Sequence, residues 1–381
     1  MKNVRNSGRF GQPDLTRPSG RTGEIDFLRF VFSVCIVILH FEANYHFGIF
    51  THAGVLVEFF FLVSGYLMAR HVARMENRPQ TWGEIADSTW KYLLKKAGSF
   101  YRYYFAVVIL NFAVREILIR HQALKIVVRE LLRGIPTFSL TFMGLNYQYS
   151  SLYVGNTWYL SAMLIAMFML YPLLVKQFRL SVKLVFPLIS LFVLGYLYNT
   201  YGELTKWENW NGFAYTGVLR AVAEVALGAS LYHVSRAARK CYDQWIYAET
   251  MGGKLLPTLI KAGCYGAVVI YACNGGLLGK NATLHVLLLC AVGVVISFAG
   301  IGYSIPDSRL TRWLGKISLP IFIFHGFLRW TCKDLTGNAA VTPKQALLLI
   351  AASIAISIGL MYATDFIADR IKPLFAKKHA A

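Results

Sequence analysis

Residues 25–43 read IDFLRFVFSVCIVILHFEA, an apolar run that contains two basic side chains of different kinds, Arg29 and His40. A run of this length and hydropathy can cross the hydrocarbon core of a bilayer as a helix. Eleven positions at about 100° each place the two side chains within roughly 20° of one another, about 16–17 Å apart along the axis. Ionisable groups inside a span are costly and commonly functional. The segment predicts a membrane helix with a permanent cation and a titratable imidazole on one face.

The whole chain has the composition of an integral membrane protein. Of its 381 residues, 56% are hydrophobic and 15% are charged, whereas soluble proteins carry about a quarter charged residues. The formal net charge of +20 could suggest a nucleic-acid partner. The basic residues lie mostly in short loops between apolar segments, however, which is the topology signal of a polytopic protein. We therefore expect membrane lipids, and no nucleic acid, as partners.

Hydropathy predicts an all-α, polytopic transmembrane helical bundle of about ten spans. The expected spans are residues 25–44, 53–73, 99–120, 157–176, 183–201, 214–234, 257–276, 283–304, 316–332 and 345–367. Loops rich in Lys and Arg alternate with loops poor in them, so both termini are expected to be cytoplasmic. The expected organisation is a polar cytoplasmic tail (1–24), a membrane domain (25–367) and a basic cytoplasmic tail (368–381). The first tail has no signal-peptide pattern and is typical of a disordered segment.

Residues 120–133, RHQALKIVVRELLR, depart from this charge rule because they carry five basic residues on the expected outer side. Lys125, Arg129 and Arg133 are spaced four apart, with apolar residues between them. This pattern predicts a basic amphipathic helix that lies on the membrane surface. An anchor to lipid headgroups is favoured over a binding site for an acidic polymer.

Four ionisable residues within the expected spans are placed where they could form two pairs. Glu58 lies about five residues into the second span and His40 about four from the outer end of the first, so the two can share a depth. A carboxylate beside an imidazole can orient the ring and stabilise its cationic form, and such a pair can act as a general base. The alternative is a Glu–His pair that only joins two helices. Arg220 and Glu224, four apart in the sixth span, are expected to pair with each other.

A series of short motifs runs through the chain. GEIDFLRFVFSVCIVILH (residues 23–40) is followed by VEFFFLVSGYLMA (57–69), in which an acidic residue and aromatics precede Ser-Gly-aromatic. NTWYLS (156–161) opens a later helix, and LGKISLPIFIFH (314–325) ends on a histidine. Together these segments resemble the acyltransferase-3 family of integral membrane O-acyltransferases, over nearly the whole chain.

The resemblance implies a reaction and a location. Enzymes of this family take an acyl group, most often acetyl, from cytoplasmic acyl-CoA and place it on a sugar hydroxyl. The acceptor is a surface polysaccharide or its lipid-linked precursor, so we expect acetyl-CoA and such a glycan as partners in a bacterial inner membrane. The His residues are too dispersed for a metal-ligand pattern, and no metal is expected.

Cations near the cytoplasmic end of the bundle suit the donor. Arg29, together with Lys95, Lys96 or Arg102, would bind the phosphates of CoA. An arginine fork suits phosphate because it donates bidentate hydrogen bonds and keeps its charge. Lys95 to Arg102 preserve only part of an Arg-x-x-Arg element found after the second span in many relatives.

The expected chemistry centres on His40. It would deprotonate the acceptor hydroxyl, with Glu58 orienting the ring by analogy with the third group of a hydrolytic triad. Ser64 could donate a hydrogen bond to the thioester oxygen, or equally pack in a helix crossing beside Gly65. Direct attack and an acyl-histidine intermediate both remain open.

Three further residues are candidates for substrate contact. Asn156 and Trp158 lie at the expected outer surface, where they could contact a sugar, although Trp158 could equally be an interfacial anchor. His325 could line the same site.

A secondary transporter or flippase for a glycan or small solute is the alternative function, since buried charges in many spans also suit that role. No internal duplication supports it. A non-catalytic protein that senses or assembles polysaccharide machinery is a third possibility, against which the Arg29, His40 and Glu58 pattern weighs.

Overall fold

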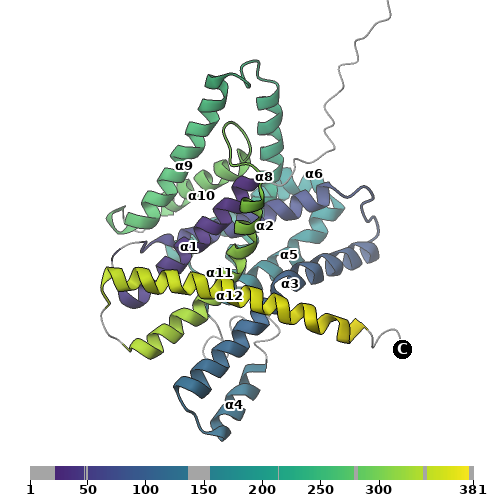
Figure 1. The fold of residues 1–381 in the computed structure, drawn as a ribbon. Coiled ribbons are helices and arrows are strands. Elements are labelled where there is room, and N and C mark those ends of the chain that lie inside the picture. Colours follow the sequence, from purple (N-terminus) through teal and green to yellow (C-terminus); the bar gives the residue numbers. More distant parts are fainter. Residues whose placement is uncertain are drawn as a thin grey trace, which may run out of the picture.

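The computed structural model describes residues 22–46, 48, 50–135, 155–212, 214–278, 282–337 and 341–376. Of the expected tails, residues 1–21 and 377–381 lie outside this part of the chain. The described residues form an all-α protein, as Figure 1 shows, with one small strand pair besides the helices. The predicted fold class is confirmed to that extent.

Most described residues belong to α-helices. These are α1 (Gly23–Tyr45), α2 (Leu56–Ala73), α3 (Trp82–Phe112), α4 (Leu124–Gly134), α5 (Trp158–Lys176), α6 (Phe178–Leu180), α7 (Phe186–Tyr201), α8 (Thr216–Asp243), α9 (Met251–Leu278), α10 (Ala282–Ser297), α11 (Arg309–Thr336) and α12 (Pro343–Ala376). Short 3-10 turns at Ala53–Val55 and Gly155–Thr157 precede α2 and α5, and π-helical turns at Ala113–Ile119 and Ser181–Val185 adjoin α3 and α7. β1 (Trp210–Asn211) pairs antiparallel with β2 (Ala214–Tyr215).

Five helical stretches in the described part are long and apolar enough to cross a membrane. They are Ala53–Ala73, Gly155–Lys176, Phe178–Tyr201, Met251–Cys273 and Pro343–Arg370. The chain is therefore a polytopic membrane protein, although five is fewer than the expected number of about ten. Each remaining expected span overlaps a helix, but α1, α3, α8 and α11 carry several charged residues and α10 is short.

Local signals begin and end several of these helices. α3 begins with a capping box in which Thr81 and Glu84 bond reciprocally to each other's backbone N–H. α11 begins with the same arrangement between Ser308 and Thr311. Such boxes satisfy N–H groups that have no partner within the helix. α7 is followed by Gly202, whose φ of 69° is the left-handed conformation that glycine adopts without strain at the end of a helix.

α2 and α8 cross with their backbones in direct contact. A Cβ atom at Gly65 of α2 would collide with the carbonyl oxygen of Val225, and one at Gly228 of α8 would collide with that of Leu62. Small residues at such a crossing let two membrane helices approach closely. The crossing fixes which side chains of α2 face α8.

α1 and α11 lie side by side and run in the same direction. His40 contacts His325, and Asn44, one turn later, contacts Arg329, one turn later on α11. Near the start of both helices, Asp26 packs against Gly315, where a Cβ atom would collide with its carboxylate. The matching order of these contacts makes the two helices parallel.

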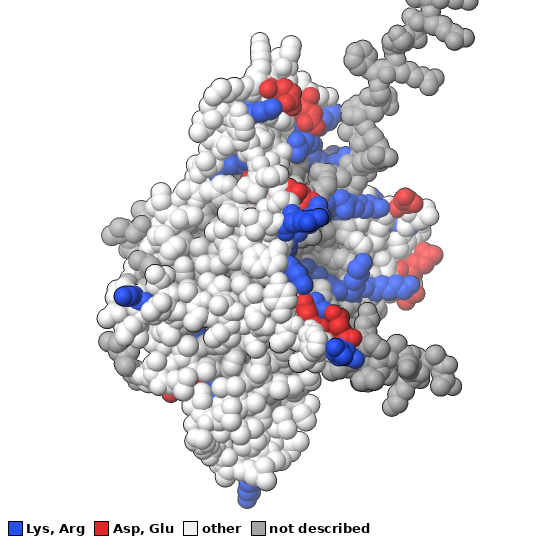
Figure 2. Space-filling model, in the orientation of Figure 1, with Lys and Arg blue, Asp and Glu red and all other residues white. Residues whose placement is uncertain are grey.

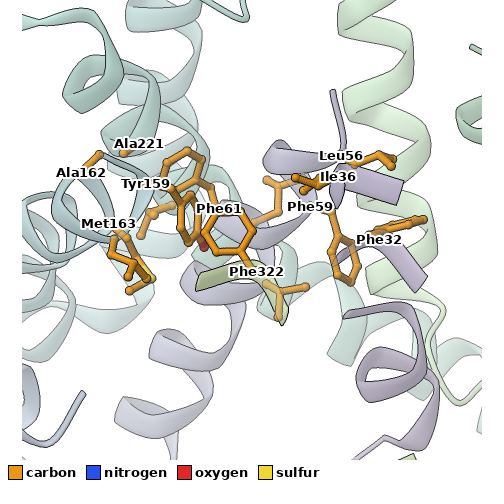
Figure 3. Close-up of a cluster of buried hydrophobic side chains, with 14 of the residues drawn as sticks. Phe32, Ile36, Leu56, Phe59, Phe61, Tyr159, Ala162, Met163, Ala221 and Phe322 are labelled. Carbon is orange, nitrogen blue, oxygen red and sulfur yellow. The ribbon is translucent and has the colours of Figure 1, made fainter. Parts of the chain in front are cut away.

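An aromatic cluster joins α1, α2, α5 and α11 in the middle of the bundle (Figure 3). Phe32 of α1 meets Phe59 of α2 edge-on, with ring centroids 4.7 Å apart. Phe61 of α2 lies 4.4 Å from the ring of Tyr159 on α5. Aromatic pairs at these separations add to the stabilisation from buried area. The cluster sets the spacing of the helices that surround the candidate site.

α4 is the amphipathic helix predicted within residues 120–133. Its basic residues repeat every four positions, and Leu124 and Leu132 are 78% and 61% exposed. The helix lies at one extremity of the molecule in Figure 1. Its attachment to the membrane surface stays a prediction.

Candidate active site

Two cavities inside the bundle share two lining side chains, Tyr159 and Phe322. The first has a volume of about 110 Å³ and is lined by Arg29 and Lys96, so we call it the cationic cavity. The second has a volume of about 240 Å³ and is lined by His40, so we call it the histidine cavity. The cation and the imidazole predicted on one face of the first helix therefore line two adjoining cavities.

The cationic cavity combines charges with hydroxyl groups. Arg29 of α1 keeps 26% of its side chain exposed and lies 3.5 Å from Asp26. Lys96 and Ser99 reach the cavity from α3, and Ser318 reaches it from α11. Guanidinium, ammonium and hydroxyl groups all donate hydrogen bonds, so the cavity suits an anion.

Two of the four cations predicted to bind CoA do not line this cavity. Lys95 is exposed on α3. Arg102, further along α3, forms an ion pair with Asp365 of α12 at 3.2 Å and donates to the hydroxyl of Tyr103. Successive residues of a helix point in different directions, which separates Lys95 from Lys96.

Ser64 takes both of its expected positions. It is the residue before Gly65 in the α2–α8 crossing, and its hydroxyl lines the cationic cavity. Its Oγ lies 3.3 Å from the hydroxyl of Tyr159 and 3.3 Å from the sulfur of Met163. The Ser64 hydroxyl thus lies on the wall of that cavity, in contact with Tyr159 and Met163.

The ring of His40 is held by two contacts to its Nδ1 atom. Nδ1 lies 2.9 Å from the carbonyl oxygen of Ile36 and 3.1 Å from Nε2 of His325. Nδ1 of His325 in turn lies 3.2 Å from the carbonyl oxygen of Ile321. Because a carbonyl oxygen only accepts, we assign a hydrogen to both Nδ1 atoms. Nε2 of His325 then accepts from His40, and Nε2 of His40 retains its lone pair.

Glu58 does not form the predicted hydrogen bond with His40. Its Oε1 accepts from Arg220 at 3.2 Å, and its Oε2 has no partner among the described residues. The reason is the α2–α8 crossing, which presents Glu58 to α8 instead of α1. His325 takes the place beside His40 that was expected for Glu58.

Arg220 joins two buried carboxylates. Its Nε donates to Glu224 at 2.9 Å, which confirms the predicted pair four residues apart. The three side chains of this Glu58–Arg220–Glu224 cluster are at most 2% exposed. Nη1 of Arg220 also donates to the carbonyl oxygen of Thr205, and both residues line the histidine cavity. The contribution of Arg220 to the site was not predicted, because its sequence pattern indicates only a local pair.

Asn156 and Trp158 both line the histidine cavity, near His40. The amide nitrogen of Asn156 donates to the carbonyl oxygens of Phe322 and Ile323, while its Oδ1 has no partner in the described part. Trp158 stacks on Trp207 with centroids 5.0 Å apart and planes 13° apart. Trp207 was not predicted, because nothing in its loop sequence marks it as part of a site.

The described side chains form no group of three His, Cys, Asp or Glu residues that could hold a metal ion. Charge in the two cavities comes from Arg29, Lys96 and Arg220. The arrangement provides one cavity that suits an anion and one that offers an imidazole lone pair beside hydrogen-bonding and aromatic groups.

No curated protein and no solved structure matches the chain. A family model does match it, over residues 22–363, and that model describes an acyltransferase domain, Acyl_transf_3. The matched residues carry both cavities and all the side chains that line them. The chain therefore belongs to the acyltransferase 3 family of membrane acyltransferases.

Proposed function

We propose that this protein transfers an acyl group, acetyl first of all, from cytoplasmic acetyl-CoA to a glycan hydroxyl. The acceptor is a cell-surface polysaccharide or its lipid-linked precursor, and the membrane is the bacterial inner membrane. One observation carries the proposal: the cavity lined by His40 shares part of its wall with the cavity lined by Arg29 and Lys96. A base and an anion site are thereby adjacent without occupying the same space.

The proposal includes ten spans with both termini in the cytoplasm. In that topology α1 and α11 hold the first and ninth spans and must be parallel, as their matched contacts require. α2 and α8 hold the second and sixth spans, which must also be parallel. Glu58 lies beside Arg220, and Leu62 lies beside Gly228. These contacts advance in the same direction along both helices, as two parallel helices require.

Contacts between segments distant in sequence support the same topology. Each of these contacts joins the ends of two spans, or of a span and a loop, that the proposed topology places on the same side of the membrane. On the proposed cytoplasmic side Glu24 pairs with Lys261 and Gln80 with Lys176, and on the outer side His52 bonds to Ala272 and Arg115 to Asp334. In Figure 2 the blue Lys and Arg atoms gather mainly on the right, the direction in which α12 ends in Figure 1. This asymmetry agrees with the positive-inside rule.

The cationic cavity is the proposed donor site. Arg29 lies near the proposed cytoplasmic end of α1, and with Lys96 it would bind the phosphates of CoA through charge-assisted hydrogen bonds. The thioester would then extend inward toward Ser64, whose hydroxyl can donate to the thioester oxygen. Lys95 and Arg102 fall outside this cavity, so we leave them out of the donor site.

The histidine cavity is the proposed acceptor site. The stacked rings of Trp158 and Trp207 offer an apolar face to a sugar ring, and Arg220 and Asn156 offer a donor and an acceptor to its hydroxyls. Ligand sites commonly combine apolar walls with a few placed polar groups in this way. Glu58 would act indirectly by holding Arg220 in position.

His40 is the proposed general base. Its Nε2 would take the proton of the acceptor hydroxyl while that oxygen attacks the thioester carbonyl carbon. The carbon–sulfur bond then breaks, and the proton passes from His40 to the departing CoA sulfur. His325 would orient the ring and stabilise its cationic form through Nδ1–H, the role that a carboxylate has in a hydrolytic triad. An acyl group carried transiently on His40 would use the same residues in two steps.

The test is transfer of label from radiolabelled acetyl-CoA to the polysaccharide fraction of the host, in membranes that contain the protein. Wild type and a control variant, His233→Ala, should both transfer label, because His233 is exposed on α8 and lines neither cavity. His40→Ala should transfer label at least about 100-fold more slowly while reaching the membrane in normal amounts. Equal transfer by His40→Ala would refute the assigned base. No transfer by any variant, together with electrogenic solute uptake in liposomes, would favour a transporter instead.

A further inference from the structure

Aromatic rings separate the two cavities. Tyr159 of α5 and Phe322 of α11 line both, and their rings meet edge-on with centroids 5.5 Å apart and planes at 73°. Phe60 of α2 lines the cationic cavity, with its ring 6.0 Å from that of Phe322 and 6.3 Å from that of Tyr159. We call Phe60, Tyr159 and Phe322 the aromatic wall. Figure 3 shows Tyr159 and Phe322 close together in the centre of the cluster.

The wall is held on both sides by groups of the proposed site. The hydroxyl of Tyr159 lies 3.3 Å from that of Ser64 in the cationic cavity. The carbonyl oxygen of Phe322 accepts from Asn156 in the histidine cavity, and the Phe322 ring lies 5.7 Å from the ring of His325. Buried side chains with such contacts on several sides have little freedom to move aside.

We propose that the aromatic wall selects short acyl groups, acetyl over longer chains, by limiting the space for the acyl chain where the donor site meets the histidine cavity. This inference rests on the proposed function. A thioester that enters past Arg29 and Lys96 has its acyl group directed at the wall, beyond which His40 lies. A methyl group adds little length at this point, whereas a longer chain has to displace a ring. In apolar pockets one extra methylene changes discrimination by about 10- to 200-fold.

The test compares acetyl-CoA with hexanoyl-CoA as donors in the same membrane preparation. The ratio of their kcat/KM values does not depend on how much protein is folded, so a poorly folding variant still gives a result. Wild type should favour acetyl by at least about 10-fold. Phe322→Leu should raise the hexanoyl-to-acetyl ratio by about 10-fold or more, and Tyr159→Phe, which keeps the ring, should leave the ratio unchanged.

Phe61→Leu is the matched control. Phe61 lies 4.4 Å from the ring of Tyr159 in the same cluster, but it lines neither cavity. Its replacement should leave the ratio at the wild-type value. An unchanged ratio in Phe322→Leu, or an equal rise in Phe61→Leu, would overturn the role of the wall while the enzyme still uses acetyl-CoA. Failure of wild type to use any acyl-CoA would instead refute the proposed function, and the inference with it.

Discussion

Nδ1 of His40 lies 3.1 Å from Nε2 of His325, and this contact joins the parallel helices α1 and α11. Each Nδ1 also lies beside a carbonyl oxygen of its own helix, so each Nδ1 carries a hydrogen. In this direction of hydrogen bonding, His40 donates and His325 accepts. This direction leaves the lone pair of His40, a residue that lines the histidine cavity, on Nε2.

Replacement of His325 by Phe should therefore lower kcat without abolishing transfer. It removes one neutral hydrogen-bond acceptor, worth about 0.5–1.5 kcal/mol, which corresponds to a roughly 2- to 13-fold loss. His40→Ala should cost about 10²- to 10⁴-fold, the usual contribution of a general base. Steady-state kinetics with acetyl-CoA would measure both, and KM for the donor should stay the same in His325→Phe. Equal losses in the two variants would contradict this division of roles.

Removal of cations from the cationic cavity should weaken donor binding. Arg29→Gln or Lys96→Met removes a hydrogen bond to a charged group, worth about 1.5–3 kcal/mol, so KM for acetyl-CoA should rise by roughly 10- to 150-fold. Lys95→Met is the control, because it removes the same charge one position earlier on the exposed side of α3. Its KM should match that of wild type. A similar rise in Lys95→Met would indicate that net charge, not the cavity, attracts the donor.

The Glu58–Arg220–Glu224 cluster should respond unequally to changes of its members. Arg220→Leu leaves two nearly fully buried carboxylates without their cation, and loss of one partner from a buried pair costs about 3–5 kcal/mol. Thermal unfolding in detergent should occur at a clearly lower temperature. Glu58→Gln keeps an oxygen that accepts from Arg220, so it should retain the fold and measurable transfer. Complete loss of transfer in a stable Glu58→Gln protein would restore a direct catalytic role for this carboxylate.

The α2–α8 crossing should not tolerate larger residues. Gly228→Ala places a Cβ atom against the carbonyl oxygen of Leu62, and overpacking of this kind typically costs about 1–3 kcal/mol. Gly195→Ala in α7 is the matched change, because a Cβ atom there meets nothing within 4 Å. Unfolding temperatures of the two variants should differ, with only Gly228→Ala lowered. Equal stability would show that the backbones can separate without cost.

Much of the helical framework could be predicted from the sequence. Hydropathy and the 3.6-residue period are local properties, so each expected span overlaps a helix, and the basic amphipathic segment forms α4. The pair Arg220–Glu224 was equally local and is confirmed. The five spans that satisfy length and hydropathy are fewer than expected, since a span that faces other helices can carry charges that a lipid-facing span cannot.

Partners on different helices were harder to predict. The sequence places Glu58 and His40 at a similar depth in the membrane, but depth does not decide how a helix is rotated about its own axis. The close contacts of Gly65 of α2 with α8, and of Gly228 of α8 with α2, set that rotation and turn Glu58 to Arg220. His325 was expected only as a candidate lining residue, and its contact with His40 depends on the register of α1 against α11.

By itself the sequence determined the membrane class, the helices and the alignment of Arg29 with His40 along one face, because these follow from composition and the geometry of a single helix. Only the tertiary structure decided that His325 lies beside His40, that Arg220 and Trp207 line the same cavity, and that aromatic rings lie between this cavity and the one lined by Arg29 and Lys96. These relationships depend on how helices pack and rotate against one another, and packing is set by many weak contacts between residues distant in the chain.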